Sequence, residues 1–73
     1  MTTVAVLGER ALIQGYALAG GLPLVAETPE QARERWERLP PGVQVVVLTP
    51  AAAAALSAAR DEAAAPMTVV MPA

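Results

Sequence analysis

Four short apolar runs divide the chain at regular intervals. They cover residues 4–7, 22–26, 43–48 and 67–71 and contain few polar positions. Uninterrupted apolar runs of this length are typical of strands that are covered on both faces of a parallel sheet. Pro23, near the start of the second run, predicts an edge strand, because proline has no N–H group to donate to a neighbouring strand.

The segment after the first run predicts a helix over residues 9–19. Its buried face is expected where apolar or small residues recur at helical spacing, at Leu12, Gly15/Tyr16 and Ala19. Gly20-Gly21 then ends the helix, since glycine readily adopts the left-handed conformation found there. Gly15 costs the helix roughly 1 kcal/mol of intrinsic propensity. We therefore expect a neighbour to pack closely against Gly15, most simply the sheet.

The clearest helix start is Thr28-Pro29-Glu30-Gln31. It combines a threonine N-cap, proline at the first helical position, an acidic first turn and a glutamine that completes a capping box. This helix is expected to bury one face and to carry ion pairs on the other. The buried residues are Ala32, Trp36 and Leu39, with Trp36 capping the core, and the pairs are Glu34–Arg38 and Arg33–Glu37.

Thr49-Pro50 repeats the same threonine-proline start and predicts a third helix over residues 51–65, which Pro66 ends. Strand and helix thus alternate as βαβαβαβ, with connections that favour right-handed crossovers between parallel strands. We predict a single α/β domain over residues 1–73: a three-layer fold around a four-stranded parallel sheet of order 2-1-3-4. So short a chain buries only about 60% of its unfolded surface, so a partner or a second copy is expected to complete it.

Composition removes several functional classes. The chain has five arginines and seven acidic residues, for a net charge of −2, and no lysine. No face is therefore expected to be basic enough to bind nucleic acid. The absence of cysteine and histidine removes disulfides, thiolate nucleophiles and the commonest general base and metal ligands. We assign no catalytic, cofactor-binding or metal-binding residue.

The termini and apolar stretches indicate a cytoplasmic protein without direct membrane insertion. Residues 1–3 lack the basic region of a signal peptide. The longest apolar stretch, residues 43–59, contains Pro50 and polar residues and is shorter than the ~20 residues of a membrane-spanning helix.

Ligands of open α/β sheets bind at the carboxyl ends of the strands. Here those ends are Gly8-Glu9-Arg10, Glu27-Thr28, Thr49-Pro50 and Met71-Pro72. Residues 8–15 carry neither the GxGxxG nor the GK[ST] pattern, which disfavours nucleotide binding. A receiver-type phosphoacceptor domain has this layout, but it needs an acidic pair after the first strand, an aspartate after the third and a lysine. This chain has Glu9 alone, Thr49 and no lysine.

Two minor alternatives remain open at these strand ends. Glu9 and Glu27 are expected to be solvated carboxylates near helix N-termini, but two such groups with water can also hold a hard cation such as Mg²⁺. A small enzyme would have to rely on few groups, namely Glu9, Glu27, Thr28, Thr49 and Tyr16.

Four segments together resemble the F subunit of V-type and archaeal-type rotary ATPases. They are Val4-Ala5-Val6-Leu7-Gly8, Gly15-Tyr16-Ala17-Leu18-Ala19-Gly20, Glu27-Thr28-Pro29-Glu30-Gln31-Ala32 and Val45-Val46-Val47-Leu48-Thr49. The family motif maps onto Gly8, Gly15, Tyr16, Leu18, Ala19, Gly20, Thr28 and Pro29. Three features depart from the family pattern: Glu9 stands for its aspartate, Ala17 for its arginine, and its C-terminal helix after the fourth strand is absent.

The resemblance implies a non-catalytic regulatory subunit of the central stalk of a proton- or sodium-translocating ATPase, docked on the coiled-coil D subunit. The alternative is a stand-alone regulatory or ligand-sensing receiver-like module, homo-oligomeric and outside the ATPase. In either case the apolar end of the chain is expected to need a cover, because an open edge strand of this composition invites aggregation. The residues expected to contact a partner are Glu9, Tyr16, Met67, Val69 and Met71.

Overall fold

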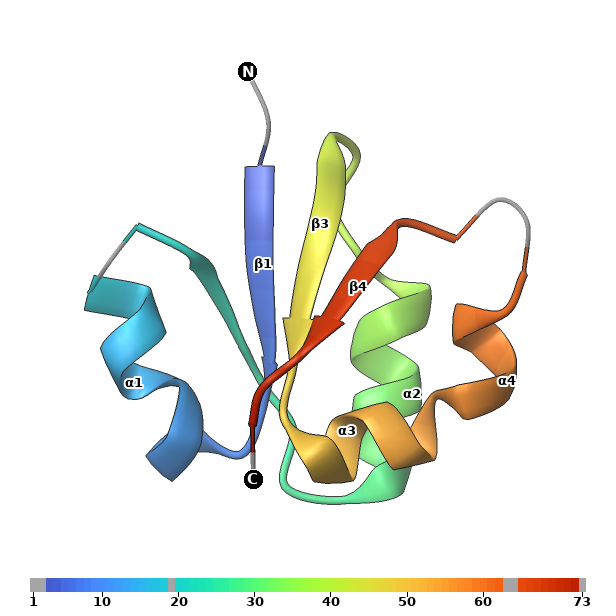
Figure 1. Cartoon of the computed structure of the whole chain (residues 1–73), viewed down its shortest axis with the longest axis horizontal. Coiled ribbons are helices and arrows are strands. Elements are labelled where there is room, and N and C mark those ends of the chain that lie inside the picture. Colours follow the sequence, from blue (N-terminus) through green and yellow to red (C-terminus); the bar gives the residue numbers. More distant parts are fainter. Residues whose placement is uncertain (1–2, 19, 63–64, 73) are drawn as a thin grey trace.

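The computed structural model describes residues 3–18, 20–62 and 65–72, and for residues 16–18 it describes the backbone only (Figure 1). The side chains of Tyr16, Ala17 and Leu18 and the whole of Ala19 lie outside this description. The elements, in chain order, are β1 (Thr3–Gly8), α1 (Arg10–Leu18), β2 (Leu22–Val25), α2 (Pro29–Glu37), β3 (Val43–Leu48), α3 (Pro50–Ala55), α4 (Ser57–Arg60) and β4 (Met67–Val70).

The four strands form one parallel sheet in the order β2-β1-β3-β4, which confirms the predicted α/β fold and strand order. β2, which contains Pro23, is an edge strand as expected, and β4 is the other edge. Helix α1 lies on one side of the sheet, while α2, α3 and α4 lie on the other (Figure 1). Within the described residues, no helix is long and apolar enough to cross a bilayer.

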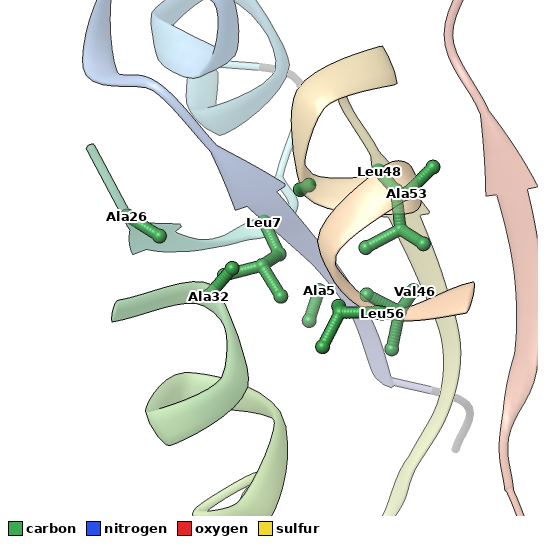
Figure 2. Close-up of a cluster of buried hydrophobic side chains, with 9 residues drawn as sticks. Ala5, Leu7, Ala26, Ala32, Val46, Leu48, Ala53 and Leu56 are labelled. Carbon is green, nitrogen blue, oxygen red and sulfur yellow. The ribbon is translucent and has the colours of Figure 1, made fainter. Parts of the chain in front are cut away.

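The main core lies between the sheet and helices α2 and α3. Alternate residues of β1 and β3 point into it and meet small residues of the helices, as Figure 2 shows. Trp36 and Leu39 pack against the edge of this cluster, which confirms the predicted buried face of α2. The fully or nearly fully buried members are Ala5, Leu7, Ala26, Ala32, Val46, Leu48, Ala52, Ala53 and Leu56. Alanine at the helix positions lets α2 and α3 approach the sheet closely.

A smaller core lies under α1 and corrects one prediction. Among the described side chains of α1, Ile13 and not Leu12 packs on the sheet, where it meets Val6 and Met71. Leu12 is 51% exposed and Gly15 is also exposed. Apolar residues occur on more than one side of α1, so periodicity alone did not identify the side that faces the sheet.

Gly15 also differs from expectation. Apart from its chain neighbours and the backbone of its own helix, no described atom lies within 4 Å of the position that a Cβ on Gly15 would take, so the close neighbour predicted for this residue is absent among the described residues. Gly20 behaves as predicted: it follows the helix with a φ of +96°, in the region that favours glycine.

The start of α2 is as predicted, but one of its ion pairs is not. Arg38 contacts Glu34 at 3.6 Å, as expected. Arg33 contacts Glu30 at 3.7 Å, whereas a pair with Glu37 had been expected. An acidic residue is favoured on the N-terminal side of its basic partner, and Glu30 satisfies that order while Glu37 does not.

The predicted third helix is broken in two. α3 ends at Ala55, Leu56 adopts a non-helical conformation, and α4 follows as a single turn. Leu56 lies in the main core, and beyond the break Arg60 donates hydrogen bonds to the Ala53 carbonyl and the Thr68 hydroxyl. High alanine content favours helix at each residue, so the local sequence gives no signal for this break. Residues 63 and 64 lie outside the described structure.

The glycines near the end of α1 give a matched pair of predictions. Gly15→Ala should raise the free energy of unfolding by about 0.5–1 kcal/mol, because alanine favours helix and its Cβ meets no neighbour. Gly20→Ala should lower it by about 1–2 kcal/mol, because an alanine at positive φ is strained. Urea unfolding followed by far-UV circular dichroism measures both. A loss of stability in Gly15→Ala would show that this residue packs against something.

Candidate functional site

The carboxyl ends of β1, β2 and β3 meet at one edge of the sheet. Two backbone hydrogen bonds join them beyond the strands: Ala26 N–H donates to the Gly8 carbonyl at 2.9 Å, and Thr49 N–H donates to the Leu7 carbonyl at 3.2 Å. These bonds bring the polar residues that follow the three strands close together. The structure thus gathers Glu9, Glu27, Thr28 and Thr49 where the sequence placed the candidate chemistry.

Thr49 is the central polar residue of this edge and is completely buried. Its hydroxyl donates to Glu9 Oε1 at 2.6 Å and accepts from the Ala52 N–H at 3.3 Å. The second bond makes Thr49 the N-cap of α3, as the threonine-proline motif predicted. Because the hydroxyl already both donates and accepts, it is held as part of the fold and is not presented to a ligand as a nucleophile.

Gly8 provides the space that Thr49 occupies. A Cβ on Gly8 would overlap the Thr49 side chain, and even the Thr49 Cβ would be only 2.8 Å away. The Thr49 Cβ is attached directly to the backbone and keeps its place when the side chain rotates, so no simple rotation relieves the overlap. Gly8 is therefore required by close packing between the ends of β1 and β3.

Glu27 and Gln31 organise the neighbouring helix starts. Glu27 Oε2 accepts a hydrogen bond of 3.4 Å from the N–H of Arg10, the first residue of α1. Gln31 N–H donates to the Thr28 hydroxyl at 3.1 Å, which confirms the predicted N-cap. The Gln31 side chain accepts a hydrogen bond of 2.8 Å from the N–H of Glu27. In a standard capping box this side chain would bond the N–H of the N-cap residue, Thr28, so the bond here reaches one residue further back.

A pocket of about 270 Å³ opens between these helix starts. Its lining combines the two carboxylate residues with apolar and small ones: Glu9, Ala26, Glu27, Thr28, Pro29, Ala32, Ala51 and Ala52. Both carboxylates lie near helix N-termini, as expected, where helix dipoles favour negative charge. Within the described residues, no three acidic side chains cluster to hold a metal ion. The pocket offers hydrogen-bond acceptors and apolar contact but no paired nucleophile and base.

The residues expected to contact a partner fall into different environments. Glu9 is half-buried and hydrogen-bonded to Thr49. Met67 and Val69 are exposed, at 68% and 50%. Met71 is buried against Val6 and Ile13, so it belongs to the core rather than to the surface. The Tyr16 side chain lies outside the described residues.

An apolar surface lies on the side of the sheet that α1 covers only in part. Side chains of Val6 and Val47 face α1, so the alternate residues Val4 and Val45 share that face. Strand register adds Met67 beside Val45 and Val69 beside Val47. We call Val4, Val45, Met67 and Val69 the β3–β4 face. Val4 is 38% exposed. Its place on this surface was missed from the sequence, because only strand order and register reveal it.

No protein-family model matches the chain, and a comparison with curated proteins finds no significant relative.

The packing of Gly8 can be tested directly. Gly8→Ala should lower the free energy of unfolding by at least about 1–3 kcal/mol, because its methyl group overlaps Thr49. Gly42→Ala is a useful comparison, because a Cβ on Gly42 would meet no described neighbour but the residue has a φ of +93°. The stability that this variant loses therefore reports backbone strain without overlap. Chemical denaturation measures both. Wild-type stability in Gly8→Ala would contradict the close contact between β1 and β3.

The role of the Thr49 hydroxyl gives a second prediction. Thr49→Val keeps the shape but removes the bonds to Glu9 and Ala52, and should destabilise the fold by about 1–3 kcal/mol. Thr49→Ser keeps the hydroxyl and loses one methyl group, so it should cost less, about 1 kcal/mol. Thermal and urea unfolding of the pair measures this order. The reverse order would show that the methyl group, not the hydroxyl, is what this position requires.

Proposed function

We propose that this protein is a non-catalytic protein-interaction subunit that acts as the F subunit of a V-type or archaeal-type rotary ATPase does. The observation that supports this most is the β3–β4 face, where Met67 and Val69 expose apolar surface beside the sheet edge. Exposed apolar surface that is contiguous across strands is characteristic of a protein-binding site. The partner proposed from the sequence resemblance is the coiled-coil D subunit of the central stalk.

The strand ends support a binding role over a catalytic one. The Thr49 hydroxyl and the Glu9 and Glu27 carboxylates take part in hydrogen bonds that hold the ends of β1, β2 and β3 and the starts of α1 and α3. Side chains committed to helix starts in this way stabilise the fold. In the proposed role the protein lies on the cytoplasmic side, peripheral to the membrane through the ATPase complex, and regulates how ATP turnover is coupled to rotation.

A second function is favoured by a different observation. The pocket of about 270 Å³ lies at the carboxyl ends of the strands, where open α/β sheets bind ligands. A stand-alone regulatory or ligand-sensing module would use this pocket. Its two glutamates and apolar walls suit a small molecule that carries hydrogen-bond donors and an apolar part.

The stalk role is tested by co-expression with a coiled-coil D-type subunit of a rotary ATPase. The two chains should co-purify as a complex. Met67→Glu should weaken it at least tenfold, because a carboxylate would replace apolar contact, while Val70→Glu, on the opposite side of β4, should leave it nearly unchanged. Biolayer interferometry measures the affinities. Absence of any complex would contradict the proposed function and favour the ligand-sensing alternative.

A further inference from the structure

The two sides of the sheet are covered unequally. Helices α2 and α3 pack on one side and bury the main core, whereas α1 alone lies on the other (Figure 1). The side chains that packing and register place on the α1 side are apolar: Pro23, Val25, Val4, Val6, Val45, Val47, Met67 and Val69. Strands of this kind are found where helices cover both faces. The β3–β4 face has the composition of a covered surface but has no cover within the described structure.

The uncovered area has the dimensions of one short helix. The part of this face on β3 and β4 is two strands wide, about 10 Å at a spacing of about 4.8 Å, and the four residues of β4 give a length of about 13 Å. A helix is about 10 Å across, and nine residues extend about 13.5 Å. Helix α1 has nine residues. A helix of the length of α1 therefore fits the β3–β4 face.

Helix α1 is itself more apolar than a surface helix needs to be. Its sequence, RALIQGYAL, contains Arg10 as the only charged residue, whereas α2 contains five. It buries Ile13 against the sheet but leaves Leu12 51% exposed, and no described side chain lies within 4 Å of where a Cβ on Gly15 would be. A helix that is apolar on several sides is usually buried on several sides. The same molecule thus presents a helix with unused apolar surface and an uncovered face of matching size.

We propose that two copies of this chain associate by exchanging these surfaces, so that α1 of each copy covers the β3–β4 face of the other. A two-fold axis that runs between the two α1 helices and roughly along them allows both contacts at once. The α1 side of each sheet is then covered by two helices. This dimer rests on the proposed function in one respect: both use the β3–β4 face as an interaction surface.

The expected dimer is weak. Each exchanged face is about 10 Å by 13 Å, so even two such contacts amount to less than the roughly 800 Å² per partner of a standard stable interface. A dissociation constant in the micromolar range is expected, since small interfaces retain little free energy after the cost of association. A stalk partner that binds the same face would compete with the second copy.

Sedimentation equilibrium of the purified chain, from about 1 µM to about 1 mM, tests the inference by mass action. The average mass should rise from 7.5 kDa towards twice that value. Leu12→Glu and Met67→Glu should each weaken association at least tenfold, because each buries a carboxylate in apolar surroundings. Val70→Glu is the matched control, because Val70 is 40% exposed in the same strand but faces the side of the sheet opposite α1. Association of this variant should be nearly unchanged.

Three results would overturn the exchange: a constant mass of 7.5 kDa, a loss of association in Val70→Glu as large as in Met67→Glu, or wild-type association in Leu12→Glu. Because the substituted residues are exposed, far-UV circular dichroism should show folded variants. Hydrogen exchange of the wild type gives an independent measurement, in which α1 amides become more protected as concentration rises. If the chain stays monomeric, the exchanged dimer is wrong but the proposed stalk role still stands. If the chain dimerises but binds no D-type subunit, only the stalk role is wrong.

Discussion

The close contact between Gly8 and Thr49 is the constraint on which the rest of the structure depends. β1 is flanked by both β2 and β3, and its last residue lacks a Cβ, so the buried Thr49 side chain can lie directly against it. From that position Thr49 starts α3 and binds Glu9, the residue that leads into α1. One small residue therefore sets where β3 ends, where α3 begins and how the start of α1 is held.

The same packing engages the polar groups at the carboxyl edge of the sheet in hydrogen bonds within the fold. In many α/β proteins the polar residues at this edge bind ligands. Here the polar groups after β1, β2 and β3 bind one another and the first N–H groups of the helices. Among the described residues, every buried side-chain polar atom has a hydrogen-bond partner. The groups that hold a small, alanine-rich domain together are thus the ones that another protein of this layout would present to a substrate.

The surface proposed for recognition lies elsewhere, on the side of the sheet that α1 covers in part. Two helices give the main core its depth, but one helix cannot span four strands, so Met67 and Val69 remain exposed. A domain of 73 residues has little apolar surface to spare, and leaving this much uncovered lowers its own stability. Association with a stalk subunit, or with a second copy through α1, would recover that free energy.

The sequence by itself determined the order of elements, the parallel sheet and the helix starts. Apolar runs identify the strands of the parallel sheet, and the threonine-proline pairs at Thr28 and Thr49 place helix starts through local hydrogen bonds. These features depend on residues close together in the chain, so local pattern suffices. The polar candidates at the strand ends were found for the same reason, since a parallel sheet brings all carboxyl ends to one edge.

Only the tertiary structure decided which side of each element is buried and which groups meet. α1 is apolar on several sides, and only its packing on the sheet decided that Ile13 rather than Leu12 is buried. The alanine segment favours helix throughout, and its break at Leu56 is visible only in the structure. The bond between Thr49 and Glu9 joins residues 40 positions apart. The β3–β4 face combines side chains from three strands. Such contacts depend on strand order and register, which arise from the packing of the whole chain rather than from any local pattern.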